Sequence, residues 1–413
     1  MTGHHTGWFP RLRLVCLNLA LFTGSLVVFA LAFEGSIRVV NWWERERAWE
    51  ERQRLFPPCT IPDPRLGIRL KPHFSGRRAS RGEYDVIEQI NSIGLRDDRE
   101  YGPKPNGTFR LLVLGDSFTY GMGVALQDTY ERQIERLINA QLADRHYEVI
   151  NAGVPGYDTA QELEWLEMIG PRLEPDLIVV GFFIGNDITN NAQRVPATRQ
   201  KFEEHEQRFY TSTTYQARLP IPFKTMLAER SEAYAFIRER YHRLLQIIRI
   251  RQQPSEANIW WLDQYRKDVV FEHEPGYAYT DTLLTRMAAW AAEHGAGLSI
   301  VLIPDQGQVY PEYWRKAIGD IIAFDLARYD VAKPNRWLVA FGRRTGVPVL
   351  DLLPRFQERS HQMKLYYDRD RHWTRAGYRL AAEEIMRFLI DQRFLIDQRL
   401  LMRQSKARHQ AVR

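Results

Sequence analysis

A serine and a histidine far apart along the chain have sequence neighbours that could make the serine a nucleophile. The serine lies in the run Gly115-Asp116-Ser117-Phe118-Thr119, directly after an apolar stretch typical of a strand. At a sharp turn from a strand to a helix, a serine hydroxyl is exposed and its backbone N–H is free to bind an anion. Because a serine hydroxyl is a weak nucleophile until a base takes its proton, the sequence must also supply a histidine with an acidic partner.

The candidate base is a histidine in the loop Asp368-Arg369-Asp370-Arg371-His372, before the last expected helix. An acid shortly before a histidine on a loop can turn back to the imidazole Nδ1. This contact fixes the tautomer and leaves Nε2 to face the serine. Alone, a Gly-Asp-Ser triplet occurs in ordinary turns, and a loop histidine is more often structural. The ordered pair of motifs is more specific and predicts nucleophilic chemistry at the serine.

Short apolar runs alternate along the chain with segments of helical period, and these elements must position the two motifs. Strands are expected at residues 110–114, 147–150, 176–183, 298–303 and 347–351, and helices at residues 129–142, 160–173, 280–294, 337–345 and 375–388. Apolar strands alternating with helices are typical of an α/β fold with a parallel sheet covered on both faces. Ligands of such sheets bind at the carboxyl ends of the strands.

Two regions depart from this alternation. Residues 190–278 are rich in Arg, Glu, Gln and Tyr, and their helical character is clearest at residues 231–251. We interpret them as a helical insertion, which either caps the site or decorates the periphery. Near the C-terminus, residues 387–392 recur as residues 393–398, which indicates a short duplication that extends the last helix.

The N-terminal region carries a membrane signal. Residues 14–33 contain no charged side chain, and 20 residues at about 1.5 Å each are long enough for a hydrocarbon core of about 30 Å. Arg11 and Arg13 precede this run, so the chain is expected to cross the membrane once with its N-terminus inside. The alternatives are a signal peptide with Ala30-Leu31-Ala32 as its cleavage site, or a buried helix of a soluble domain.

These patterns divide the chain into five parts. We expect a cytoplasmic stub with the anchor at residues 1–36, a juxtamembrane helix and linker at 37–62, an N-terminal extension at 63–109, the main domain at 110–392, and a helical extension with a basic tail at 393–413. Prolines at positions 57, 58, 62 and 64 set the expected end of the linker, because they break the preceding helix.

Composition and charge exclude several classes of protein. Hydrophobic residues make up 44% of the 413 residues and charged residues 26%, which excludes a fibrous, collagen-like or wholly disordered chain. The 2 cysteines exclude a disulfide scaffold, and no Cys-x-x-Cys pair suggests a zinc or redox site. The net charge of +6 favours anchoring near lipid headgroups over binding of nucleic acid, since no nucleic-acid motif is present.

With these motifs in place, the chain resembles the SGNH (GDSL-type) hydrolase family over residues 110–190 and 296–390. The family's signature blocks stand in order along the chain as Leu114-Gly115-Asp116-Ser117-Phe118-Thr119, Asn151-Ala152-Gly153-Val154-Pro155-Gly156, Gly185-Asn186-Asp187 and Asp370-Arg371-His372. The resemblance implies a three-layer, flavodoxin-like parallel sheet.

The resemblance also implies a role for each signature residue. Ser117 would be the nucleophile, and His372 would be the general base and later the general acid toward the leaving alcohol. The backbone N–H groups of Ser117 and Gly153 and the side-chain amide of Asn186 would form the oxyanion hole.

The acid of the triad is the point where the sequence departs from the commonest family pattern. There the acid lies three positions before the histidine, a position that Arg369 occupies here. Asp370, two positions before the histidine, is our first choice, and Asp368 is the reserve. Asp116 and Asp187 are expected to hold the loops by hydrogen bonds rather than to take part in the chemistry.

The implied reaction is a two-step acyl transfer through an acyl-enzyme, without a metal or cofactor. We predict an esterase for acetyl or other short acyl esters of a cell-envelope carbohydrate or lipid. An O-acyltransferase of an exopolysaccharide and a non-catalytic carbohydrate-binding module are the alternatives. Residues 63–67 and 91–96 are similar to a stretch of membrane-anchored bacterial members, which implies an inner-membrane protein with its catalytic domain on the extracytoplasmic side. The oligomeric state stays open.

Overall fold

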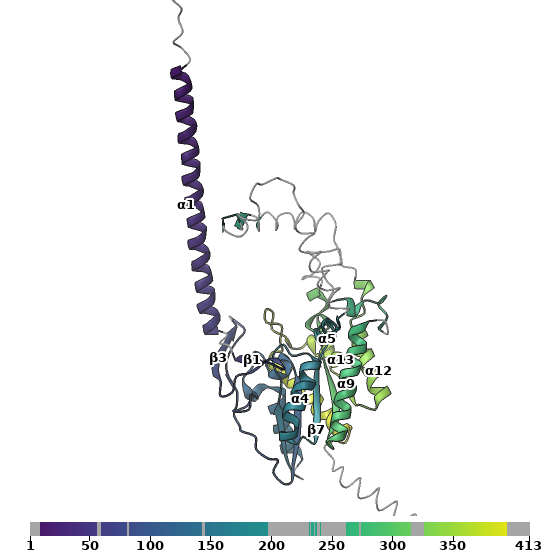
Figure 1. Cartoon of the computed structure of the whole chain (residues 1–413). Coiled ribbons are helices and arrows are strands. Elements are labelled where there is room, and N and C mark those ends of the chain that lie inside the picture. The colour runs from purple at the N-terminus through teal and green to yellow at the C-terminus, as the bar shows by residue number, and fades with distance from the viewer. Residues whose placement is uncertain are drawn as a thin grey trace, which may run out of the picture. The chain divides into compact units, whose positions relative to one another are not determined.

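The computed structural model describes residues 9–55, 59–80, 82–142, 145–196, 231, 233–234, 236–237, 240, 262–271, 274–314 and 326–394. The chain forms two compact units. One comprises residues 1–53 and 207–253, and the other comprises residues 54–206 and 254–413. Figure 1 shows the helices and strands of both.

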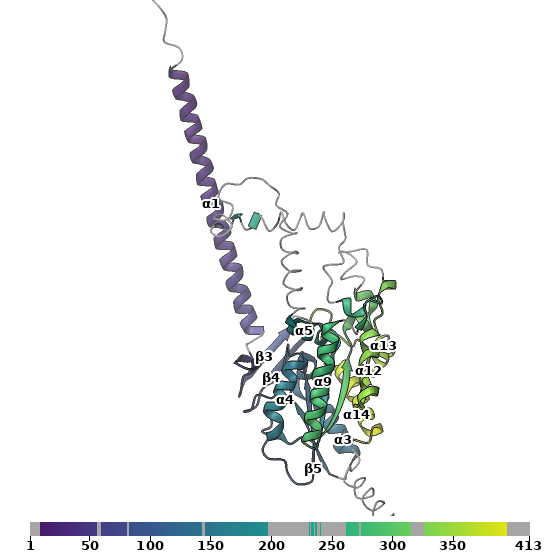
Figure 2. The ribbon, with the colours of Figure 1, turned by 45° about the vertical axis from the view of Figure 1, so that its right-hand side comes forward.

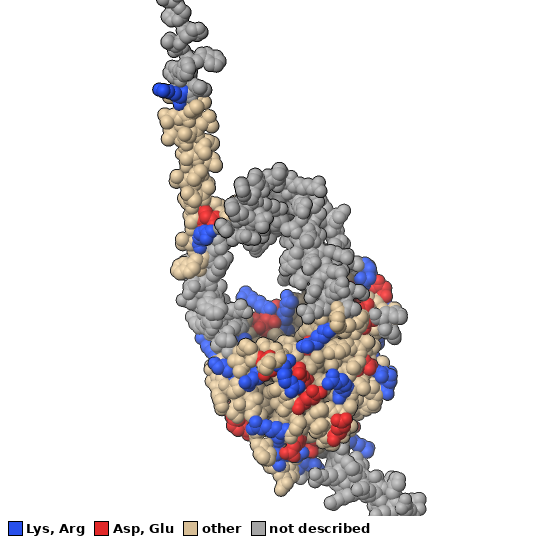
Figure 3. Space-filling view, viewed as in Figure 1, with Lys and Arg blue, Asp and Glu red and all other residues tan. Residues whose placement is uncertain are grey.

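The first unit contains most of a long helix, α1 (Phe9–Leu55). Its stretch Arg13–Val40 has a mean hydropathy of 2.3 over its most apolar window, and none of that window is buried. Twenty-eight residues are long and apolar enough to cross a membrane, as a signal anchor or as a signal sequence. In Figure 3 this part of α1 is almost free of charged atoms. The stretch contains the predicted span at residues 14–33.

The second unit begins with two antiparallel hairpins, which precede the main sheet. They are formed by β1 (Thr60–Asp63) with β2 (Gly67–Leu70), and by β3 (Ser75–Ser80) with β4 (Tyr84–Gln89). The expected linker to residue 62 is therefore too long, because strand pairing already begins at Thr60. A proline at position 62 is compatible with this strand, since a two-stranded ribbon leaves one edge of each strand unpaired.

The centre of the second unit is a parallel sheet of five strands, as the alternation of the sequence predicts. Its order, β6-β5-β7-β8-β9, places the second strand of the sheet outside the first, as in flavodoxin-like folds. In that order the strands are β6 (His146–Asn151), β5 (Thr108–Gly115), β7 (Leu177–Phe183), β8 (Gly297–Ile303) and β9 (Val349–Asp351).

Helices cover both faces of this sheet (Figures 1 and 2). The described helices of this unit are α2 (Ser117–Tyr120), η1 (Leu126–Asp128), α3 (Tyr130–Gln141), α4 (Thr159–Leu173), α5 (Asp187–Arg194), α9 (Pro275–Glu293), α10 (Gln306–Val309), η4 (Leu326–Arg328), α12 (Lys333–Thr345), α13 (Leu353–Ser360) and α14 (Arg375–Asp391). The predicted α/β class with a covered parallel sheet is confirmed.

Two apolar cores, one on each face, hold the three layers together. Side chains of β5 alternate between them, as neighbouring residues of a strand must. Leu112 and Leu114 pack in the core formed with α4, α9 and α12, whereas Leu111 and Val113 pack in the core formed with α3, α13 and α14. Burial on both faces explains why the strands are continuously apolar.

The described residues also limit two sequence expectations. Helix α14 ends at Asp391, because Arg393 has a φ of 59° and cannot continue an α-helix. The predicted extension of the helix through residues 393–398 is therefore wrong at its start, and residues 395–413 lie outside the described part of the chain. Most of the expected insertion at 190–278 also lies outside it, although α5 and α9 reach into its two ends.

The buried carboxyl group of Glu131, in the first turn of α3, makes stability depend on pH. Neither of its oxygens has a hydrogen-bond partner among the described residues. Burial raises the pKa of Glu131 from 4.5 to about 8. The folded state therefore holds this proton more tightly than the unfolded state. The stability that this proton contributes is complete below about pH 4.5 and is lost as the pH rises to about 8.

We expect Glu131→Gln to flatten this loss. The amide cannot ionise, so the variant should lose up to about 1.4 kcal/mol less per pH unit across that window. Urea unfolding of both proteins at pH 5, 6.5 and 8 measures the difference. The change from a carboxyl to an amide group shifts the free energy of unfolding of the variant equally at every pH. Only the slope of this free energy against pH therefore tests the prediction. Parallel curves for the two proteins would contradict the prediction.

Candidate active site

Ser117 opens helix α2 immediately after strand β5. Asp116 caps this helix, because its Oδ1 accepts a hydrogen bond from the Phe118 N–H at 2.9 Å. Gly115 must be a glycine here: a Cβ atom on it would lie 2.1 Å from the Thr119 Oγ1. The turn from strand to helix is therefore sharp, and as the first helical residue Ser117 has a backbone N–H without an acceptor within the helix.

The structure brings Ser117, His372 and Asp370 into one hydrogen-bonded row. The His372 Nε2 lies 2.7 Å from the Ser117 Oγ, and its Nδ1 lies 2.6 Å from the Asp370 Oδ1. With the Nδ1 proton shared with the carboxylate, Nε2 is the acceptor for the serine proton. This is the arrangement that activates a serine for attack on a carbonyl carbon.

The backbone at Arg371 explains why an acid two positions before the histidine can reach it. Arg371 has a φ of 70°, a left-handed conformation that tightens the loop between Asp370 and His372. Asp368 does not reach the imidazole. Its exposed carboxylate instead accepts a hydrogen bond from the Lys364 Nζ at 2.5 Å. The structure therefore pairs Asp370, and not the reserve Asp368, with the histidine.

Two residues of the β3–β4 hairpin, which no sequence pattern singled out, also contact the loop. The Tyr84 hydroxyl donates to the Asp370 Oδ2 at 2.7 Å. The Glu83 carboxylate accepts hydrogen bonds from the backbone N–H groups of Arg369 at 2.8 Å and Asp370 at 3.1 Å. Burial acts to raise the pKa of Asp370, but the hydrogen bonds and charge of His372, with the Tyr84 hydroxyl, hold that pKa below its usual value.

The expected oxyanion donors lie at the carboxyl ends of three neighbouring strands, β5, β6 and β7. The Asn186 Nδ2 donates to the Asp116 Oδ2 at 3.4 Å, which leaves its second amide hydrogen for a ligand. The Gly153 N–H donates to the Asn151 Oδ1 at 3.0 Å. A Cβ atom on Gly153 would lie 2.3 Å from the Tyr120 N, so only glycine allows this loop to approach α2 so closely.

Buried carboxyl groups support these loops from below. The Asp187 Oδ2 accepts a hydrogen bond from the Phe183 N–H at 2.8 Å. Burial raises the pKa of Asp116 to about 6, and burial together with Glu162 and Asp116 raises the pKa of Asp187 far above its usual value. Asp116 and Asp187 thus have the loop-supporting contacts that the sequence suggested.

Aromatic side chains close the inner side of the site. The Phe118 ring packs on the His372 ring with 4.9 Å between centroids and on the Phe183 ring with 4.4 Å. Tyr120 and Trp373, which flank the motifs in sequence, are fully buried and belong to the core. The described residues contain no group of three His, Cys, Asp or Glu side chains arranged to hold a metal ion.

Comparison with known proteins identifies the family. The sequence model of the GDSL-like Lipase/Acylhydrolase family matches residues 113–380, which is more than half of the chain. The chain belongs to this family. As a GDSL-like acylhydrolase, it is an ester hydrolase. The match begins within β5 and ends within α14, so the two N-terminal hairpins lie outside it.

Solved structures of similar fold include several GDSL-like and related hydrolases. The crystal structure of TesA shares 15% identity, with a TM-score of 0.36 over 68% of this chain and 97% of that one. A lipase/acylhydrolase from Enterococcus faecalis shares 14%, with a TM-score of 0.35 over 69% and 96%. A catalytic mutant of an acetylxylan esterase from Geobacillus stearothermophilus shares 13%, with a TM-score of 0.35 over 70% and 96%. No curated protein sequence matches the chain.

Proposed function

We propose that Ser117, His372 and Asp370 are the catalytic triad of this ester hydrolase. The observation that carries the proposal is the unbroken row of hydrogen bonds, 2.7 Å from the serine to the imidazole and 2.6 Å from the imidazole to the carboxylate. Ser117 attacks the ester carbonyl while His372 takes its proton, and His372 then returns that proton to the leaving alcohol. Water attacks the acyl-enzyme by the reverse of the same steps.

The oxyanion that forms at the carbonyl would be bound by the Ser117 N–H, the Asn186 amide and the Gly153 N–H. The last of these donates to the Asn151 side chain in the present structure, so it would have to be shared with, or transferred to, the oxyanion. The Asn186 amide is already held by Asp116, which supports its orientation toward the serine. Donors fixed before the reaction stabilise the developing charge most effectively.

We propose an acetyl or other short acyl ester of an envelope carbohydrate or lipid as the substrate. The packing of Phe118 on Phe183 and on His372 supports a short acyl chain, because these rings occupy space beside Ser117. The apolar stretch of α1 supports attachment of the protein to the inner membrane, and Arg13 at the start of that stretch supports an extracytoplasmic catalytic domain.

A series of p-nitrophenyl esters tests the acyl preference. The full-length protein in detergent should hydrolyse acetate and butyrate with a kcat/KM at least about tenfold above that for a twelve-carbon ester, because a long chain would have to displace packed side chains beside the serine, at a cost of about 1–3 kcal/mol. A preference for the long ester would contradict the short-acyl proposal and favour a lipid substrate. Acylation of an added oligosaccharide in preference to water would instead favour the O-acyltransferase.

A further inference from the structure

The β3–β4 hairpin contacts the loop that carries Asp370 and His372, although it lies outside the part of the chain that the family model matches. Three hydrogen bonds join the two segments, one from the Tyr84 hydroxyl and two to the Glu83 carboxylate. All three end on residues 369 and 370 of the loop. The hairpin therefore contacts the acid of the row directly.

We propose that Tyr84 and Glu83 are positioning residues that fix the carboxylate of Asp370 for catalysis. This inference rests on the triad proposed above. The hydrogen bonds of both residues to the loop end on Arg369 and Asp370, so both act through Asp370. The N-terminal extension is then a working part of the active site and not only a link between the apolar helix and the main domain.

The two oxygens of Asp370 show what Tyr84 contributes. Oδ1 accepts the His372 Nδ1–H and Oδ2 accepts the Tyr84 hydroxyl, so the carboxylate is held at both ends and cannot turn about its own axis. A hydrogen bond to an ionised acceptor is about twice as strong as one between neutral groups. Without the hydroxyl, the second oxygen of a largely buried carboxylate would lose its partner and the orientation of Oδ1 would be less defined.

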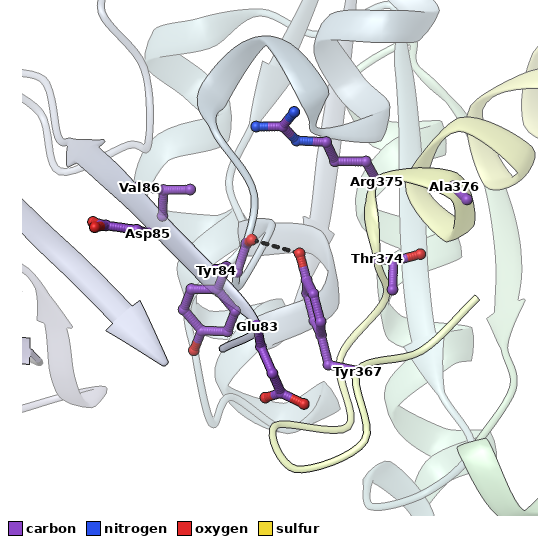
Figure 4. A pocket seen from close by; sticks show the side chains of 9 residues that line it. Glu83, Tyr84, Asp85, Val86, Tyr367, Thr374, Arg375 and Ala376 are labelled. Carbon is purple, nitrogen blue, oxygen red and sulfur yellow. Dashed lines mark hydrogen bonds between the residues drawn. The ribbon is translucent and has the colours of Figure 1, made fainter. Parts of the chain in front are cut away.

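The hydroxyl of Tyr84 is itself held in place. Its ring is 8% exposed and packs against the Tyr367 ring, with 5.2 Å between the centroids. A Cβ atom on Gly123 would lie 3.0 Å from both rings, so this residue leaves just enough room for the pair. The two rings lie side by side (Figure 4) and border a cavity of about 510 Å³, and the Tyr367 hydroxyl donates a hydrogen bond to the Gly123 carbonyl at 3.1 Å.

Glu83 acts on the backbone of the loop. Arg371 holds a left-handed conformation that a non-glycine residue adopts only at some cost, and the hydrogen bonds to Glu83 fix the two residues before it. Since the unusual spacing of acid and histidine depends on this turn, Glu83 stabilises the geometry that lets Asp370 reach the imidazole. The Ser80 hydroxyl donates to the same carboxylate at 3.1 Å and orients it within the hairpin.

Tyr84→Phe in the full-length protein is the decisive variant, because it keeps the ring and removes only the hydroxyl. We expect kcat for p-nitrophenyl acetate to fall by about 5- to 20-fold with KM within about twofold, since the loss acts on the transition state through the base. Tyr157→Phe is the matched control: it makes the same change at a tyrosine whose hydroxyl donates to the Ile68 carbonyl and not to Asp370, and it should leave kcat within about twofold.

The pH profile separates positioning from a loss of fold. His372 from its own loop and Tyr84 and Glu83 from the hairpin face Asp370, with Tyr367 and Arg375 bordering the adjacent cavity. The Tyr84 hydroxyl favours the ionised carboxylate, so its removal should shift the decline of kcat/KM at low pH upward by about one pH unit. A merely structural role would lower the whole profile without moving it.

Two further measurements decide the outcome. In an Asp370→Ala background, Tyr84→Phe should have no additional effect on kcat, because the group through which it acts is gone. Glu83→Ala should lower kcat by about 3- to 10-fold without changing labelling of Ser117 by a fluorophosphonate at saturation. Equal kcat and pH profiles for Tyr84→Phe and wild type would overturn the proposal. If Ser117→Ala retained activity, the proposed triad would be wrong. This test of the triad does not depend on the Tyr84 and Glu83 variants.

Discussion

Replacing Ser117 by alanine is expected to lower kcat for p-nitrophenyl acetate by about 10⁴- to 10⁶-fold, to the level that binding and oxyanion donors alone sustain. The physical reason is that the variant lacks the Ser117 Oγ, the atom that the row of hydrogen bonds would place against the ester carbonyl. The Ser117 Oγ is the group that the His372 Nε2 contacts at 2.7 Å, and water in its place would lack the same fixed position. Turnover assays and labelling by a serine-reactive fluorophosphonate measure the effect together.

A second serine provides the control for that experiment. Ser360, at the end of α13, donates its hydroxyl to the Gln357 carbonyl, and no hydrogen bond among the described residues joins it to Ser117, His372 or Asp370, so Ser360→Ala should label and turn over like wild type. Circular dichroism of both variants verifies that they are folded. Strong labelling of the Ser117→Ala protein would show that another residue is the nucleophile, and the proposed function would then be wrong.

Replacing Asp370 by asparagine should lower kcat by about 10³- to 10⁴-fold at neutral pH. An asparagine preserves the shape of the side chain, but it no longer stabilises the imidazolium and can turn its amide toward Nδ1, which selects the wrong tautomer. Because Asp370 accepts hydrogen bonds from both His372 and Tyr84, both contacts lose their ionised acceptor in this variant.

Asp368→Asn is the matched control, because the same chemical change occurs two residues earlier in the same loop. Asp368 is exposed and bonded to Lys364, so its replacement should leave kcat within about twofold. The comparison also settles a question that the sequence left open. A severe loss in Asp368→Asn with a mild one in Asp370→Asn would mean that the loop rearranges before catalysis and that Asp368 is the acid.

The sheet was predictable because its signal is local and repeated. Each strand is buried on both faces, so it appears in the sequence as a continuous apolar run, as in residues 176–183 and 298–303. The positions of Ser117 and Asn186 followed from the same pattern, since each lies two or three residues after the end of a strand and parallel strands end at one edge. Ends of elements were less certain, as the strand at Thr60 and the end of α14 show.

The features that the sequence could not reveal depend on contacts between distant segments. The choice of Asp370 over Asp368 follows from the φ of 70° at Arg371, a backbone angle that no residue pattern announces. Tyr84 lies in a strand in which polar and apolar residues alternate, and nothing in this pattern distinguishes it from other residues of a hairpin. Its role emerges only where the fold places its hydroxyl 2.7 Å from the acid.

The distance along the chain between Tyr84 and Asp370 also orders the assembly of the enzyme. The two residues are 286 positions apart. At about 5–20 residues per second, the hairpin leaves the ribosome roughly 15–60 s before the acid that it holds. A two-stranded hairpin has little stability of its own, so we expect the β3–β4 hairpin to become stable only after the loop that carries Asp370 has been synthesised. The apolar stretch of α1 is therefore synthesised while the chain still lacks the Asp370 and His372 side chains. With the proposed triad, hydrolytic activity arises only after synthesis has passed the loop that carries Asp370 and His372, so a shorter nascent chain would not attack esters.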